Sequence, residues 1–322
     1  MAHYDVFNGD ADGICALQQL RLADPRAAVM VTGVKRDIGL LERVPAHGGD
    51  TVTVLDVSLH RNRAALERLL AQGVAVEYFD HHFAGEVPTH PLLRIHLDGA
   101  PGMCTSLIVD RHLEGRHRAW AIVGAFGDNL PAGAQALGRA QGKSPDELRA
   151  LQALGEAINY NAYGDSEADL LVAPAELALR VRPHADPLAF VAQEPVARAL
   201  IARKEADLAQ ALAIAPWRQL AGVRVVLLPD AGWARRAQGV LGNLLSQRDP
   251  ARAHAVLRDT GKGTYVVSVR APQRCPHGAD ALCLRFPTGG GRASAGGIDA
   301  LPQAGLDAFV AALAQAWPTP AE

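Results

Sequence analysis

The chain has 322 residues, of which 49% are hydrophobic, and a formal net charge of −2 at pH 7. That length suits two domains, and the near-neutral charge argues against a broad basic surface for long nucleic acid. No apolar run approaches the roughly 18 residues of a membrane span, no signal peptide is recognisable, and four scattered cysteines fit reduced thiols, so we expect a cytoplasmic protein without a membrane partner.

The first predicted strand, residues 3–7, leads into an acidic turn and then a helix with apolar residues at helical spacing. The turn carries Asp10 and Asp12. Two carboxylates would repel a phosphate, so this turn differs from a glycine-rich phosphate loop and indicates a bound cation. The alternative is ordinary Asp/Gly turn chemistry with a helix N-cap, which explains one aspartate and leaves the other without a role.

The next predicted elements are a strand, a helix, a strand and a helix, over residues 29–32, 38–44, 51–55 and 61–71. The third strand of the chain ends in Asp56. An aspartate at a strand end is most often the N-cap of the following helix. Ser58 or Asn62 could cap this helix equally well, which leaves Asp56 available to a metal.

The apolar strand 74–79 ends abruptly in Asp80-His81-His82. One carboxylate and two imidazoles form a donor set that suits Mn²⁺, Fe²⁺, Zn²⁺ or Co²⁺. The alternative is a helix cap followed by two surface histidines, and on this stretch alone the two interpretations have equal weight. A further strand, 92–97, ends in Asp98, which we interpret as a turn residue. The apolar run 119–126 predicts a buried helix that ends near Asp128.

Acidic residues thus follow four apolar elements. Because the carboxyl ends of parallel strands meet at one edge of a doubly wound sheet, we expect these side chains to converge there. Carboxylates packed together raise one another's pKa unless cations neutralise them. The count favours two divalent ions, which can activate water and hold a phosphoryl group.

The second half of the chain offers weaker signals. Tyr160 and Tyr163, interleaved with asparagines, could stack on a base, although such a run more often closes a helix end over a core. The stretch 182–187 breaks the pattern, and a long helix is predicted over 188–214. A second α/β unit follows, with a hairpin over 253–270.

Residues 288–297 are rich in glycine. Three consecutive glycines, Gly289, Gly290 and Gly291, allow backbone N–H groups to approach an anion. Arg292 follows directly and can bind a phosphate in bidentate fashion, and Arg270 could be a second anion ligand. The alternative is a flexible turn with a solvated arginine.

In order along the chain, Asp10-Ala11-Asp12-Gly13, Leu55-Asp56-Val57-Ser58, Asp80-His81-His82, Gly127-Asp128-Asn129 and the glycine run resemble the motifs of the DHH phosphoesterase superfamily, in the subgroup with a C-terminal DHHA1 domain. This resemblance implies an α/β fold: an N-terminal doubly wound, mostly parallel sheet over 1–185, a helical linker over 186–216 and a smaller α/β DHHA1 domain over 217–322. It also implies a cleft between the two domains as the place of reaction.

The resemblance assigns roles by position. It implies Mn²⁺ as cofactor, with two ions expected and Mg²⁺ or Co²⁺ as substitutes. The implied metal ligands are Asp10, Asp12, Asp56, His81 and Asp128, with Asp56 bridging. Asp80 would orient a histidine, and His82 would face the scissile phosphate or the leaving group. Catalysis would fall to Asp56, His81, His82 and Asp128, and substrate binding to His82, Arg270, Gly289, Gly290, Gly291 and Arg292.

Two positions depart from the family pattern. Asn8 stands where a histidine ligand is usual, and an amide oxygen is a weaker ligand. Arg292 stands where the glycine motif usually carries histidine, which weakens any substrate assignment borrowed from the nanoRNA hydrolases.

The expected activity is hydrolysis of phosphodiester or phosphomonoester bonds in short oligonucleotides or small nucleotides by a metal-activated hydroxide, as in RecJ-type exonucleases and oligoribonuclease-like enzymes. A phosphoanhydride hydrolase acting on polyphosphate or pyrophosphate, and a non-catalytic nucleotide-binding protein, are the alternatives. The sequence does not decide between a monomer and a homodimer.

Overall fold

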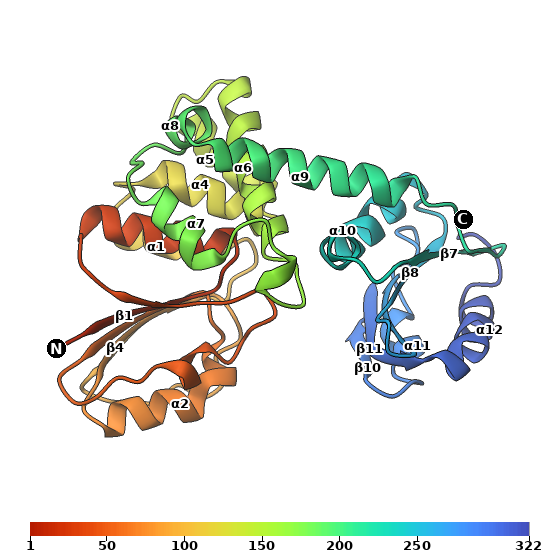
Figure 1. The fold of residues 1–322 in the computed structure, drawn as a ribbon, viewed down its shortest axis with the longest axis horizontal. Coiled ribbons are helices and arrows are strands. Elements are labelled where there is room, and N and C mark those ends of the chain that lie inside the picture. Colours follow the sequence, from red (N-terminus) through yellow and green to blue (C-terminus); the bar gives the residue numbers. More distant parts are fainter. Residues whose placement is uncertain (322) are drawn as a thin grey trace. The chain divides into compact units, whose positions relative to one another are not determined.

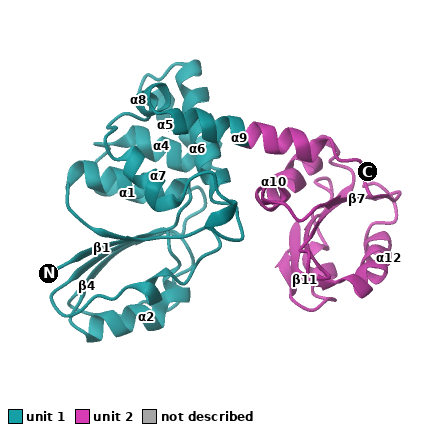
Figure 2. Cartoon of the chain, viewed as in Figure 1, with its two compact units in different colours: residues 1–203 teal, residues 204–322 magenta. Residues whose placement is uncertain are grey.

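A computed structural model describes residues 1–321, which form two compact units, residues 1–203 and residues from 204 onward (Figure 2). The division falls inside helix α9, Pro195–Leu212. The domain bounds inferred from the sequence, 1–185, 186–216 and 217–322, stay predictions. Within the described part of the chain, no helix is both long and apolar enough to cross a membrane.

Unit 1 is built on a five-stranded, all-parallel sheet in the order β2-β1-β3-β4-β5. The strands are β1 His3–Phe7, β2 Val29–Val31, β3 Thr51–Leu55, β4 Ala75–Asp80 and β5 Leu93–Leu97. The chain runs outward from β1 in one direction to β2 and in the other to β3. Such a switch point opens a crevice at the carboxyl ends of the strands, where α/β proteins bind ligands.

Helices cover both faces of this sheet, as predicted (Figure 1). On one face, Phe7, Leu55 and Phe79 pack in a core with residues of α1, α3, α4 and α6. On the other, Val54 and Tyr78 pack against α2. The helices of unit 1 are α1 Ala11–Ala23, α2 Leu59–Ala71, α3 Thr105–His112, α4 Arg118–Gly127, α5 Pro131–Ala140, α6 Pro145–Asn161, α7 Pro174–Val181 and α8 Pro187–Gln193.

Two predicted helices are wrong in extent. The helix expected over 38–44 is a single 3₁₀ turn, Leu40–Arg43, because the side chain of Asn62 hydrogen-bonds to the backbone at both Ile38 and Leu41 and holds the segment as a loop. The helix expected over 188–214 is two helices, α8 and α9. Glu194 lies between them in extended conformation, as the proline that follows it requires.

Unit 2 contains a mixed six-stranded sheet in the order β10-β11-β9-β8-β7-β6. Its strands are β6 Arg218–Gln219, β7 Val223–Leu228, β8 Ala253–Asp259, β9 Thr264–Arg270, β10 Gly289–Arg292 and β11 Ala295–Pro302, and its helices are α10 Gly232–Arg248, α11 Ala279–Cys283 and α12 Leu306–Ala316. The β8–β9 hairpin is present as predicted. The glycine run is an edge strand instead of a loop, because each of its glycines pairs with a residue of β11.

Candidate metal centre

The polar residues at the carboxyl edge of the unit 1 sheet surround a cavity of about 330 Å³. It lies at the switch point, since its lining comes from the segments that follow β1, β2, β3 and β4. The lining residues are Asn8, Asp10, Lys35, Asp37, Ile38, Asp56, Val57, Ser58, Arg61, His81, His82 and Asp128. Six of the residues singled out in the sequence therefore share one cavity.

Three carboxylates gather around one imidazole nitrogen. The Nε2 atom of His81 lies 3.4 Å from Oδ1 of Asp56, 3.9 Å from Oδ2 of Asp128 and 4.0 Å from Oδ2 of Asp12. Two donors on one divalent ion, each about 2.2 Å away, are separated by at most about 4.4 Å. All three separations fall below this bound, so each carboxylate is close enough to share a divalent ion such as Mn²⁺ or Mg²⁺ with His81. The donor atoms that are also close to one another form two groups, Asp12-His81-Asp128 and Asp56-His81-His82.

The carboxylates are fixed by contacts of their own. The two oxygens of Asp12 accept hydrogen bonds of 2.7 Å from the backbone N–H groups of Thr105 and Ser106, in the first turn of α3. Asp56 accepts a 3.3 Å bond from the Thr105 hydroxyl and has a φ of 59°, a backbone conformation that only Asn, Asp and Gly adopt readily. The site is thus held in place by its protein partners.

The Asp80-His81-His82 stretch straddles the end of β4. Asp80, fully buried as the last residue of the strand, accepts a 2.7 Å bond from Nδ1 of His82 and a 3.4 Å bond from the Leu59 N–H at the start of α2. This pairing fixes the His82 ring and, against the opposing effect of burial, raises the pKa of His82 above its usual value. His82 itself is 44% exposed, so its ring remains open to the cavity.

The clustered carboxylates repel one another. Burial, together with the charges of Asp10 and Asp12, raises the pKa of Asp56 well above its usual value. Burial and the charge of Asp12 raise the pKa of Asp128 to about 7. A divalent cation among these groups would remove the repulsion. The raised pKa values therefore support a metal site here, in addition to the donor distances.

Asp10 differs from its neighbours. Its Oδ1 caps α1 by accepting from the N–H groups of Asp12 and Gly13, and its Oδ2 lies 2.6 Å from the Nζ atom of Lys35. Although burial works the other way, Lys35 holds the pKa of Asp10 below its usual range. Sequence reasoning missed Lys35, whose one signal is its place just after β2, at the carboxyl edge of the sheet.

Two weaker sequence interpretations have clear outcomes. Tyr160 is 2% exposed and belongs to the core, which confirms for this residue the interpretation that the sequence favoured over stacking on a base. Tyr163 faces Lys35, whose Nζ lies 5.7 Å from its ring centre. Asp98 accepts a hydrogen bond from the N–H of Ala100 and is a turn residue, as interpreted.

In unit 2, Arg292 and Arg270 occupy one rung of the sheet. Ala295 of β11 pairs with Arg292 on one side and with Arg270 on the other. Directly opposed residues of antiparallel strands point to the same face, so both arginines lie on one face, about 10 Å apart along the rung. Arg270 is anchored by a 2.7 Å bond to the side chain of Asn243.

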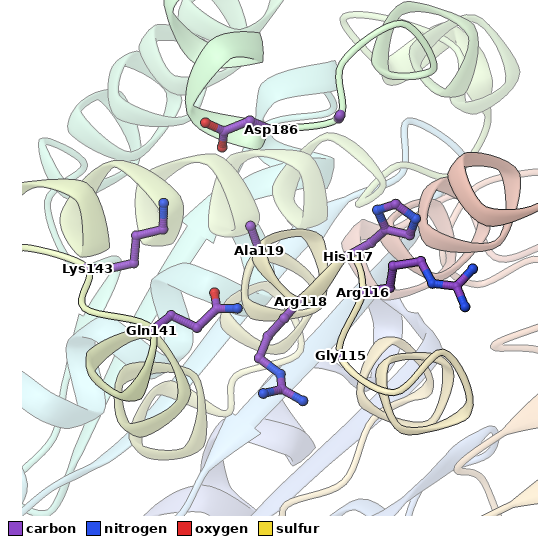
Figure 3. Close-up of a pocket in the computed structure, with 9 residues that line it drawn as sticks. Gly115, Arg116, His117, Arg118, Ala119, Gln141, Lys143 and Asp186 are labelled. Carbon is purple, nitrogen blue, oxygen red and sulfur yellow. The ribbon is translucent and has the colours of Figure 1, made fainter.

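A further cavity, of about 420 Å³, lies at the start of α4 (Figure 3). Its basic side chains spread around the rim in Figure 3, and two of them have acidic partners: Arg118 pairs with Asp110 and Lys143 with Glu147. With Asp186 as its single carboxylate, this cavity lacks the donor cluster of the first one.

The sequence matches no protein-family model and no curated protein. Solved structures, however, match nearly the whole chain. The crystal structure of an exonuclease RecJ bound to manganese aligns with a TM-score of 0.62 at 21% identity, covering 98% of this chain and 90% of that one. A DHH domain described as a member of the S1p family of ribosomal proteins aligns with a TM-score of 0.61 at 14% identity, covering 98% and 86%. A pGpG-specific phosphodiesterase from Vibrio cholerae aligns with a TM-score of 0.55 at 14% identity, covering 98% and 99%.

The chain shares its fold with these RecJ, DHH-domain and phosphodiesterase structures. The sequence identity to these proteins is low, 14–21%, so the likeness establishes the fold of the chain. Its chemistry has to be argued from the arrangement of its own side chains.

Proposed function

We propose that this protein is a divalent-metal-dependent phosphoesterase whose substrate is a short oligonucleotide or a small nucleotide. The observation that carries the proposal is the gathering of Asp12, Asp56 and Asp128 within 4.0 Å of Nε2 of His81, at the switch point of a DHH fold. Two of the structural neighbours, an exonuclease and a pGpG-specific phosphodiesterase, act on nucleic acid or a dinucleotide, which supports this substrate class.

The residues of the site divide the work. Asp12, Asp56, His81 and Asp128 would hold the cation, with Mn²⁺ or Mg²⁺ as the candidates. When bound, such an ion activates water and stabilises the charge on the phosphoryl oxygens. His82, whose pKa is raised by its hydrogen bond with Asp80, is our candidate for donating a proton from its ring to the departing oxygen.

In unit 2, the rung of Arg270 and Arg292 is our candidate for binding a further anionic group of the substrate. The guanidinium groups recognise phosphate in bidentate fashion. The near-neutral net charge of −2 fits a short substrate better than a long polyanion.

The test is hydrolysis of a substrate panel with Mn²⁺ and, separately, with Mg²⁺: a dinucleotide, phosphoadenosine phosphate, a single-stranded oligomer and polyphosphate. We expect cleavage of the dinucleotide or the phosphoadenosine phosphate, and no cleavage after chelation of the metal. Turnover of polyphosphate alone would favour the phosphoanhydride hydrolase. Saturable nucleotide binding without any turnover would make the protein a binder.

A further inference from the structure

The position of Lys35 has a consequence for the number of ions. Its ammonium group lies 2.6 Å from Oδ2 of Asp10 and 2.9 Å from Oδ1 of Asn159. Asn159 is itself oriented by a 2.9 Å bond from its Nδ2 to the hydroxyl of Tyr163, whose ring faces the ammonium group. The ammonium group of Lys35 is therefore surrounded by a carboxylate, an amide oxygen and an aromatic ring, all of which stabilise a positive charge.

The backbone of Lys35 is fixed as well. Its N–H donates to the carbonyl of Ala162 at 3.0 Å. Its carbonyl accepts from Nδ2 of Asn8 at 3.4 Å, while Oδ1 of Asn8 accepts from the N–H of Asp10 at 3.2 Å. The amide of Asn8 thus ties the Lys35 segment to the Asp10 turn, and its oxygen, a candidate metal ligand from the sequence, points to a backbone donor instead.

Asp10 consequently has no oxygen without a strong donor. Oδ1 accepts from two N–H groups of α1 at 3.0 and 3.1 Å, and Oδ2 accepts from the ammonium group. The groups of metal-binding geometry among the described residues are Asp56-His81-His82 and Asp12-His81-Asp128, which share His81 and do not include Asp10. A second divalent ion beside Asp10 would also stand close to a fixed positive charge.

We infer that the ammonium group of Lys35 takes the place of one of two metal ions, so that the centre binds a single exchangeable divalent ion around His81 and a built-in cation beside Asp10. The inference rests on the proposed metal centre, and it revises the expectation of two ions drawn from the sequence. Lys35 is then a positioning residue, which neutralises Asp10 permanently and leaves Asp12, Asp56 and Asp128 to the ion.

The experiment counts bound Mn²⁺ on the full chain by calorimetry and by electron paramagnetic resonance, which distinguishes a lone ion from a coupled pair. For the natural sequence we expect one ion per chain and the signal of an isolated Mn²⁺. For Lys35→Met, which frees Asp10, we expect two ions and a coupled signal. Arg36→Met is the matched control, because Arg36 pairs with Asp165 at an exposed position, and it should retain one ion.

The outcomes separate the two proposals. Two ions in the natural protein would overturn the role of Lys35 and leave the phosphoesterase proposal intact. One ion in both the natural protein and Lys35→Met would show that Lys35 does not exclude the second ion. No ion in either would overturn the metal centre itself. If Lys35→Met does not fold, as judged by circular dichroism and thermal unfolding, Lys35→Gln takes its place, because it removes the positive charge and keeps a polar side chain; two ions are again expected, and one ion would overturn the role of Lys35.

Discussion

The carboxyl edge of the unit 1 sheet and the β10–β11 hairpin of unit 2, which carries the glycine run, present their polar groups in opposite ways. At the sheet edge, Asp12, Asp56 and Asp80 are buried, and each has a hydrogen-bond donor from another element. In the hairpin, Arg292 stands on an exposed edge strand made of glycines. The first arrangement suits the proposed metal centre, because its charges are fixed, whereas the second suits the proposed binding of an anionic group by an exposed arginine and backbone N–H groups.

The two regions should therefore affect different kinetic parameters when they are mutated. Substitutions at the sheet edge should affect turnover and metal binding, because the buried groups there are preorganised around the proposed metal centre. Substitutions in the hairpin should affect substrate affinity and leave the chemical step unchanged.

The largest effect is expected for Asp56→Asn. Loss of this carboxylate should lower kcat by about 10²–10³-fold, the scale of removing one electrostatic contact to a transition state. The metal-free protein should unfold at the same temperature as the natural one or higher, because asparagine removes a carboxyl group whose charged form is disfavoured by burial and by Asp10 and Asp12. Asparagine accepts the φ of 59° at this position, so the backbone is retained. Turnover assays and metal-free melting curves check both parts, and full activity in this variant would remove Asp56 from the centre.

Asp80→Asn should have the next largest effect. Replacing a group that orients a metal-site histidine typically lowers activity 10–100-fold. Because Asp80 raises the pKa of His82, its loss should also move the alkaline limb of the pH–rate profile to lower pH. Asp98→Asn is the matched control at the end of the neighbouring strand, where the aspartate caps a turn and pairs with Arg111. An unshifted profile in Asp80→Asn would show that His82 is not the proton donor.

Metal binding should depend on pH through Asp128. Its pKa of about 7 in the metal-free protein means that a proton must leave before its carboxylate can bind an ion. Since its pKa is raised on folding, Asp128 contributes stability at low pH that is lost as the pH rises from about 4 to about 7. The rise in unfolding temperature produced by Mn²⁺ should therefore grow between about pH 5 and pH 8, with affinity changing about tenfold per pH unit for each proton displaced.

Thermal unfolding with and without Mn²⁺ over that pH range measures this effect. Asp128→Asn serves as the comparison, because it removes one of the raised carboxyl groups and should flatten the dependence. The remaining slope belongs to the other ligands, among them Asp56, whose pKa is also raised. A Mn²⁺ effect that is constant with pH would mean that neither carboxyl group binds the ion.

The fold and the convergence of the aspartates at one edge were predictable because topology alone brings strand ends together. An aspartate after β1, β3 or β4 must lie at the same edge once the strands are parallel, whatever the side chains do. The side chains that bind these aspartates could not be predicted from the sequence. Lys35 meets Asp10 across 25 residues and Asn159 across 124, and such pairings depend on how loops close over the edge.

In the β10–β11 hairpin, the sequence identified the glycines but not their conformation. Their composition predicts a flexible loop, and only pairing with β11 makes them a strand. Register is fixed by contacts between distant segments, so the placement of Arg292 and Arg270 on one rung could not be read from the sequence. In the same way, the break between α8 and α9 depends on one residue, Glu194, before a proline.

The smallest effect is expected in the hairpin. Arg292→Ala should raise KM about tenfold with kcat unchanged, since a hydrogen bond to a charged group contributes about 1.5–3 kcal/mol and this one is exposed. Gly290→Ala is the matched variant: a Cβ atom there meets nothing within 4 Å, whereas one at Gly289 would lie 1.8 Å from the carbonyl oxygen of Cys283. Gly290→Ala should therefore fold normally, and a raised KM in it would show that the substrate contacts the glycine backbone. A fall in kcat with Arg292→Ala, at unchanged KM, would break the contrast between the two regions, because it would place this arginine in the chemical step.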